Sequence, residues 1–108
     1  MGTVKTITVM GATGSIGQST LALVRQFPDA YSVHALVAGS DAEGLAALVR
    51  EFRPKIVGLG DAAKLDQLRE ALSGTEVEIV GGESACSKIA AMAVDIVVAG
   101  IVGIAGLP

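Results

Sequence analysis

Residues 4–17 read VKTITVMGATGSIG, and this stretch decides the fold. Its first half is rich in β-branched residues, which is typical of a strand. Gly11, Gly14 and Gly17 follow at a regular spacing, and a helical pattern comes next. A strand, a glycine-rich turn and a helix in this order are typical of the phosphate cradle of a dinucleotide-binding domain.

The three glycines each have a physical reason. We expect Gly11 to turn the chain sharply off the strand and Gly14, which has no Cβ, to let a pyrophosphate approach the backbone. Gly17 would let the first helix lie close to the sheet. The helix N-terminus then directs unpaired N–H groups and a partial positive charge at the phosphates. A tight turn without a ligand is the alternative, which the position between strand and helix disfavours.

The composition bounds the class of protein. A chain of 108 residues allows one domain, residues 1–108. Hydrophobic residues make up 51% and aromatic residues 3%, which fits a parallel sheet buried on both faces. The net charge of -3 gives no reason to expect nucleic acid or an anionic membrane as a partner. Cys86 is the only cysteine, so we expect no internal disulfide and a reducing, cytoplasmic location.

The rest of the chain alternates between helical and strand patterns. We expect a first helix at 19–27 with Thr20, Leu23, Val24 and Phe27 on one face, and a capping box at Ser40–Glu43. The predicted helices end or begin at prolines, glycines and Asp61. The predicted strands are 31–38, 55–59, 75–80 and 94–99. The second helix is expected to start at the capping box 40–43, the third at Asp61 and the fourth after Gly82. Alternating Glu76 and Glu78 place the fourth strand at a sheet edge, whereas apolar 94–99 predicts a central strand.

This pattern predicts an α/β, Rossmann-like, doubly wound parallel sheet of five strands alternating with four helices. The apolar, glycine-rich end after Gly100 predicts a fold that is incomplete at the C-terminus, to be covered by further chain or by a partner. Ligands of such sheets bind at the carboxyl ends of the strands, so the loops at 11–17, 39–41 and 100–106 are the candidates. No cluster of His, Cys and carboxylate residues has metal-ligand spacing.

Three stretches together resemble one family, the 1-deoxy-D-xylulose 5-phosphate reductoisomerases. They are GATGSIG at 11–17 with STL at 19–21, ALVAG at 35–39, and AGIVGIAGL at 99–107. The resemblance implies the N-terminal part of an enzyme that isomerises its sugar-phosphate substrate and reduces it with NADPH to 2-C-methyl-D-erythritol 4-phosphate, an isoprenoid precursor. It also implies a homodimer, and a magnesium or manganese ion held by residues beyond Pro108. No catalytic or metal residue is therefore expected in this chain.

The resemblance also implies where the cofactor lies. Phosphate contacts fall on Thr13, Gly14, Ser15 and Ile16, within the turn that Gly11 and Gly17 bound. Adenosine contacts fall on Gly39, Ser40 and Asp41, and nicotinamide contacts on Ala99, Gly100 and Ile101. Many family members have Gly-Lys-Asn where this chain has Gly39-Ser40-Asp41, so the lysine that would meet the 2′-phosphate is missing. An acid here can instead hold the ribose of NAD, so the sequence leaves the preference between NADPH and NADH open.

Two other functions remain open at this point. One is another reductase with a Gly-Ala-Thr-Gly loop, similar to aspartate-semialdehyde dehydrogenase, which would need a catalytic cysteine after this chain. The other is a non-catalytic nucleotide-binding module that binds a partner through the apolar C-terminal segment.

Overall fold

The computed structural model describes residues 4–92 and 94–99 as one parallel sheet between two layers of helices. The strands are β1 (Lys5–Met10), β2 (Tyr31–Ala38), β3 (Ile56–Leu59), β4 (Glu78–Gly81) and β5 (Ile96–Ala99). The helices are α1 (Ser15–Gln26), α2 (Ala42–Phe52), α3 (Leu65–Ala71) and α4 (Glu83–Ala90), and a short 3-10 turn, η1 (Ala62–Lys64), precedes α3. The predicted fold class is confirmed.

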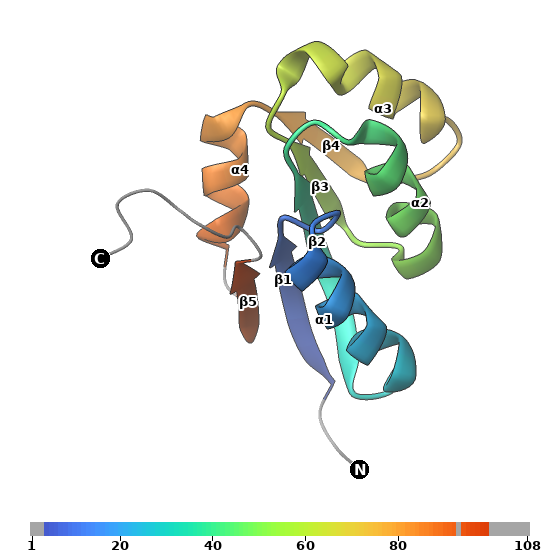
Figure 1. Cartoon of the computed structure of the whole chain (residues 1–108), viewed down its shortest axis with the longest axis vertical. Helices are drawn as coiled ribbons and strands as arrows, with labels where there is room; N and C mark the ends of the chain where they lie inside the picture. The colour runs from blue at the N-terminus through green and yellow to red at the C-terminus, as the bar shows by residue number, and fades with distance from the viewer. Residues whose placement is uncertain (1–3, 93, 100–108) are drawn as a thin grey trace.

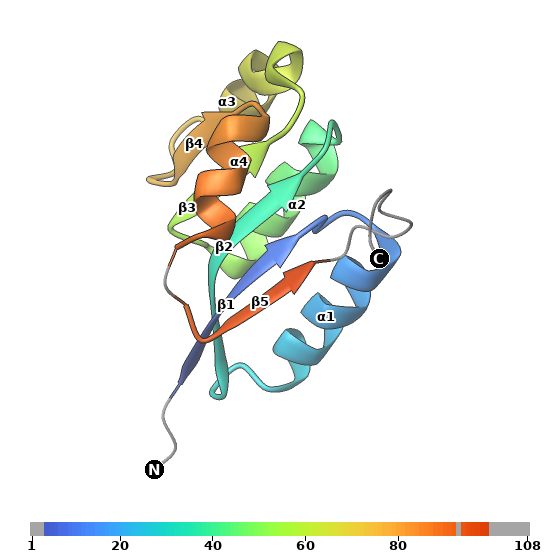
Figure 2. The ribbon, with the colours of Figure 1, turned by 90° about the vertical axis from the view of Figure 1, so that its left-hand side faces the viewer.

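The strand order β4-β3-β2-β1-β5 explains which helix covers which face. The first three crossovers all step in one direction along the sheet, so right-handed connections put α1, α2 and α3 on the same face. The chain then returns past β1 to form β5, which puts α4 on the other face. Figure 1 shows α4 alone on one side of the sheet, and Figure 2 shows it crossing in front of the strands.

The two cores differ in size because of this winding. The larger core lies under α1, α2 and α3 and is built from fully buried aliphatic side chains such as Leu21, Leu36, Leu45 and Leu68. The smaller core, under α4, contains Ala35, Val37, Ile56, Cys86 and Ile89. Both faces of the central strands are therefore dry, which is why β2 and β3 are almost continuously apolar.

A bulge in β2 lets the strand serve both cores. The register with β1 shifts between Ile7 and Thr8, which pair with Val33 and Ala35 and leave His34 as the extra residue. Val33 and Leu36 therefore both face the larger core, although they are three residues apart. Regular alternation would put them on opposite faces.

Three expectations about the elements are wrong. The first helix begins at Ser15, and its buried face is Gly17, Leu21 and Val24; Leu23 and Phe27 are more than half exposed. The first turn buries no large apolar side chain, because Ile16 is exposed and Gly17 itself makes the contact, so hydrophobic periodicity detects only the later turns. Besides these three, β4 is shorter than expected and begins at Glu78.

The second difference concerns the last strand, whose predicted central position is not seen among the described residues. Within the described residues β5 pairs only with β1 and lies at the end of the strand order, and Val97 is 46% exposed. An apolar sequence indicates that both faces of a strand can be covered by other elements. It does not indicate whether the strand has a neighbouring strand on one side or on both. The edge position predicted for β4 is confirmed.

The third error is the cap of α2. Asp41 is the N-cap residue, and its Oδ1 accepts a hydrogen bond from the Gly44 N–H over 2.9 Å. Ser40 and Glu43 therefore do not form the predicted capping box, whose register is one residue off. Asp61 caps η1 by accepting from the Ala63 N–H, as its predicted capping role requires.

Candidate functional site

The turn after β1 is held in shape by backbone contacts. Gly11 has φ 74°, in the region that favours glycine, and its carbonyl accepts from the Gly14 N–H over 3.0 Å. The Ala12 N–H donates to the Val37 carbonyl over 2.8 Å and ties the turn to β2. Because Ala12 is fully buried, this contact is shielded from water and fixes where α1 starts.

Gly17 packs against that turn rather than against the sheet itself. A Cβ added at Gly17 would lie 2.8 Å from the Ala12 carbonyl carbon and closer still to the Gly11 oxygen. The first turn of α1 therefore sits directly on the backbone of residues 11–12. The need for glycine here is as expected, but the surface that it approaches is different.

The N-terminus of α1 differs from those of the other helices. Among the described residues no side chain caps α1, and its first turn contains no acidic residue. By contrast Asp41 caps α2 and Glu43 lies in its first turn, while Asp66 lies in the first turn of α3 and Glu83 in that of α4. The partial positive charge of α1 is thus the one that these elements leave without a neighbouring carboxylate, and Ser15 and Ile16 beside it are exposed.

The predicted phosphate and adenosine segments end on neighbouring strands. Met10, the last residue of β1, pairs with Val37 of β2 on one side and with Ala99 of β5 on the other. Thr13–Ile16 thus follow the middle of three adjacent strand ends, Gly39–Asp41 follow β2, and Ala99 ends β5 (Figure 2). Gly100 and Ile101, also predicted to contact the cofactor, lie outside the described residues.

This edge is also where the winding reverses. The crossover to β2 leaves β1 in one direction, and the crossover to β5 arrives on its other side. In open α/β sheets ligands bind in the crevice that forms at this topological switch point. The structure therefore brings the candidate segments together at the position that the fold uses for ligands.

One segment of the candidate site was not predicted from the sequence. The Gly60 N–H donates to the Ala38 carbonyl over 2.9 Å, and the Asp61 N–H donates to the Gly39 carbonyl over 2.7 Å. The loop after β3 thus braces the loop after β2. A signal exists, because Asp61 follows a strand that neighbours β2, but the local pattern around Asp61 indicates only a helix cap.

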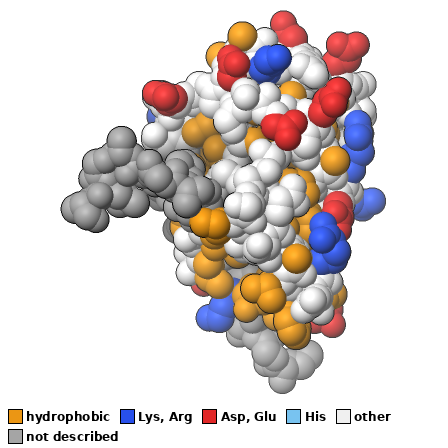
Figure 3. All heavy atoms as spheres, viewed as in Figure 1, with side chains coloured by type: hydrophobic (Ala, Val, Ile, Leu, Met, Phe, Trp, Pro, Cys, Tyr) orange, Lys and Arg blue, Asp and Glu red, His pale blue; other side chains and the backbone are white. Residues whose placement is uncertain are grey.

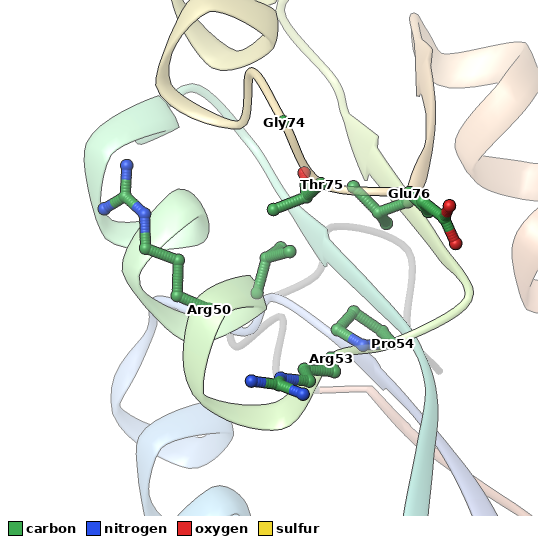
Figure 4. A pocket seen from close by; sticks show the side chains of 8 residues that line it. Arg50, Arg53, Pro54, Gly74, Thr75 and Glu76 are labelled. Carbon is green, nitrogen blue, oxygen red and sulfur yellow. The ribbon is translucent and has the colours of Figure 1, made fainter.

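Gly39 and Ser40 are exposed at this turn, and a Cβ on Gly39 would meet nothing within 4 Å. The turn is therefore open on the side where a ligand would approach. A different hollow of about 530 Å³ lies at the amino ends of β3 and β4, between the end of α2 and residues 74–77. Figure 4 shows the side chains of Arg50 and Glu76 on its rim pointing away from each other, so its charges do not converge on a ligand.

The Cys86 thiol carries no site chemistry. Burial, with a smaller contribution from Glu83, raises the pKa of the Cys86 thiol, so Cys86 is a protonated core residue of α4. Within residues 4–92 and 94–99, no three His, Cys, Asp or Glu side chains are grouped as a metal site would require. In the same part of the chain, no helix has the length and apolar character needed to cross a bilayer.

The fold and the switch-point edge define a Rossmann-like α/β domain. The family model of 1-deoxy-D-xylulose 5-phosphate reductoisomerase matches residues 7–108. The chain belongs to this family. The match also sets aside the aspartate-semialdehyde dehydrogenase alternative.

Curated relatives of the same name support this assignment. The protein of Ralstonia pickettii (strain 12J) is 55% identical over 105 residues, which cover 94% of this chain and 26% of that protein. That of Bradyrhizobium sp. (strain BTAi1) is 50% identical over 104 residues, covering 96% and 26%. The chain thus spans about a quarter of the length of the curated relatives it matches.

Solved structures agree on the fold. The reductoisomerase of Zymomonas mobilis in complex with NADPH superposes with a TM-score of 0.85 at 38% identity, over 90% of this chain and 26% of that one. A reductoisomerase in complex with NADPH, fosmidomycin and magnesium gives 0.84 at 39% identity, over 91% and 24%.

Proposed function

We propose that residues 1–108 are the NADPH-binding domain of a 1-deoxy-D-xylulose 5-phosphate reductoisomerase. The observation that carries the proposal is the uncapped, acid-free N-terminus of α1 at the switch point, in a chain whose relatives are solved with NADPH. The complete enzyme would isomerise its sugar-phosphate substrate and reduce it to 2-C-methyl-D-erythritol 4-phosphate in isoprenoid biosynthesis. It would be a cytoplasmic homodimer, without nucleic acid or membrane partners.

The predicted residues would divide the cofactor between three strand ends. Thr13–Ile16, bounded by Gly11 and Gly17, would hold the pyrophosphate through backbone N–H groups. Gly39, Ser40 and Asp41 would flank the adenosine ribose. Ala99, with Gly100 and Ile101, would wall the nicotinamide, which supplies the hydride when bound. The residues that hold magnesium or manganese and those that contact the substrate would lie outside this chain, so we expect it to bind cofactor without turnover.

Calorimetric titration of NADPH and NADH against the folded chain tests the proposal. We expect NADPH to bind, and Gly14→Val to abolish binding, because its side chain would cover the N–H groups at the start of α1. Gly14 has φ -81° and ψ 175°, which valine adopts freely, so circular dichroism should show an unchanged fold. Ser87→Ala on the exposed side of α4 is the matched control. A folded chain that binds neither dinucleotide would refute the proposal.

A further inference from the structure

Asp41 lies at the position where an acid decides between the two dinucleotides. In Rossmann domains an acid near the end of the second strand binds the ribose hydroxyls of NAD, whereas the 2′-phosphate of NADPH requires a neighbouring cation or donor. The sequence alone leaves both roles open for Asp41. Its side-chain contacts separate them.

The Asp41 carboxylate is folded onto α2. Its Oδ1 accepts from the Gly44 N–H over 2.9 Å. A Cβ added at Gly44 would lie 2.9 Å from Asp41 Cγ and 3.1 Å from Oδ1, so the carboxylate lies flat against the glycine. A side chain at position 44 would therefore require the Asp41 carboxylate to shift. Asp41 and Gly44 therefore form a matched pair that caps the helix.

The neighbouring acid is committed in the same way. Asp61, whose N–H braces the Gly39 carbonyl, uses its own Oδ1 to accept from the Ala63 N–H over 3.0 Å. Both carboxylates beside the Gly39 turn are thus turned to helix ends. Figure 3 shows acidic side chains gathered at the end of the molecule that carries α3 and the start of α2.

We propose that Asp41 is a positioning residue that caps α2 and shapes the Gly39–Ser40 turn, and that it does not bind the ribose. This inference rests on the proposed function. Its consequence is that Asp41 contributes only its charge to cofactor selection, and that charge opposes the 2′-phosphate. NADPH is then held at this end by Ser40 and backbone groups, against the repulsion of Asp41.

Asp41→Asn tests the charge, because asparagine is an equally good N-cap. We expect the Kd of NADPH to fall about three- to tenfold at low salt, with the gain shrinking at high salt, and the Kd of NADH to stay unchanged. Asp29→Asn makes the same charge change in the exposed turn at the amino end of β2, away from the carboxyl ends of the strands. It should alter neither the Kd of NADPH nor the Kd of NADH. A loss of NADH affinity in Asp41→Asn, or no change in either Kd, would overturn the proposal.

Thermal unfolding tests the cap without any cofactor. Asp41→Ala should lower the midpoint by about 4–8 °C, and Asp41→Asn by less. Gly44→Ala should raise the midpoint in the Asp41→Ala background, where alanine's helix propensity acts alone, but not in the wild type, where the new Cβ displaces the carboxylate. Additive effects would contradict the close packing of Gly44 against the Asp41 carboxylate, and an unchanged midpoint in Asp41→Ala would overturn the cap. If the unfolding midpoints change as expected but the wild type binds neither dinucleotide, the proposed function is wrong while the capping role of Asp41 still holds.

Discussion

Asp95 and Thr6, which are 89 residues apart in the sequence, exchange hydrogen bonds beside the first paired residues of β1 and β5. Asp95 Oδ2 accepts from the Thr6 N–H over 2.9 Å, and the Asp95 N–H donates to Thr6 Oγ1 over 3.2 Å. This contact lies just before the paired residues Ile7 and Ile96. It therefore sets the register in which β5 joins the sheet.

Removing the carboxylate should loosen this strand. We expect Asp95→Ala to lower the free energy of unfolding by about 1–2 kcal/mol, because the Thr6 N–H loses a charged acceptor. Asp95→Asn keeps an acceptor oxygen and should lose less than half as much. Urea unfolding followed by circular dichroism measures both, and equal losses in the two variants would contradict the assignment.

The contact of Gly17 with the turn predicts a large effect from one methyl group. Gly17→Ala should destabilise the fold by about 2–4 kcal/mol, because its Cβ would meet the Gly11 and Ala12 backbone, which cannot move aside as a flexible side chain would. Gly39→Ala is the matched control at the same edge, since nothing lies within 4 Å of its Cβ. We expect the control to unfold within about 0.5 kcal/mol of the wild type. Comparable losses in both would argue against the close packing of α1.

Thr8 is fully buried in β1, and its hydroxyl has no hydrogen-bond partner among the described residues. Replacing it with valine keeps the shape and removes the desolvated hydroxyl. We expect Thr8→Val to raise the free energy of unfolding by about 1 kcal/mol. Thr8→Ala, which leaves a cavity instead, should lower it. A lower unfolding midpoint for Thr8→Val would show that the hydroxyl is satisfied in solution.

Arg25 of α1 and Glu51 of α2 form a two-pronged ion pair, with Arg25 also 5.3 Å from the centre of the Phe52 ring. The hydrogen bond from Arg25 lowers the pKa of Glu51 in the folded state. A depressed carboxyl pKa stabilises the fold above the unfolded value and loses this contribution as the pH falls through the folded value.

Once the pH drops below the ordinary pKa of a glutamate carboxyl, about 4.3, stability should therefore fall more steeply in the wild type than in Glu51→Gln. Because both side chains are about half exposed, the difference at neutral pH should be small. Urea midpoints measured from about pH 3 to pH 7 give the comparison, with Glu70→Gln on exposed α3 as the control. Parallel curves for the wild type and Glu51→Gln would show that the pair makes no contribution.

The parts of the fold that depend on local chemistry could be predicted from the sequence. The glycine turn, β2 and the order of elements follow from residue types at fixed spacing. The start of α1 could not be predicted, because Gly17 makes its contact with backbone and leaves no hydrophobic signal. The bulge at His34 was also hidden, since apolar residues on either side fit a regular strand equally well.

For the candidate site, the sequence indicates which loops are candidates for ligand binding, but not which hydrogen bonds their side chains form. Ser40 and Asp41 are both good capping residues, and only the observed start of α2 at Ala42 decides between them. The brace from Asp61 depends on β3 lying beside β2, a relationship between strands that no local pattern contains.

The pairing of Met10 with Ala99 has a consequence for how the molecule is made. The glycine turn is synthesised before β5, the strand that completes its surroundings. Contacts between such distant segments form slowly, because the entropy of closing a long loop is lost before the contacts stabilise the chain. A nascent chain thus presents the turn before the crevice beside β5 exists, and we expect it to retain a nucleotide only after β5 has docked.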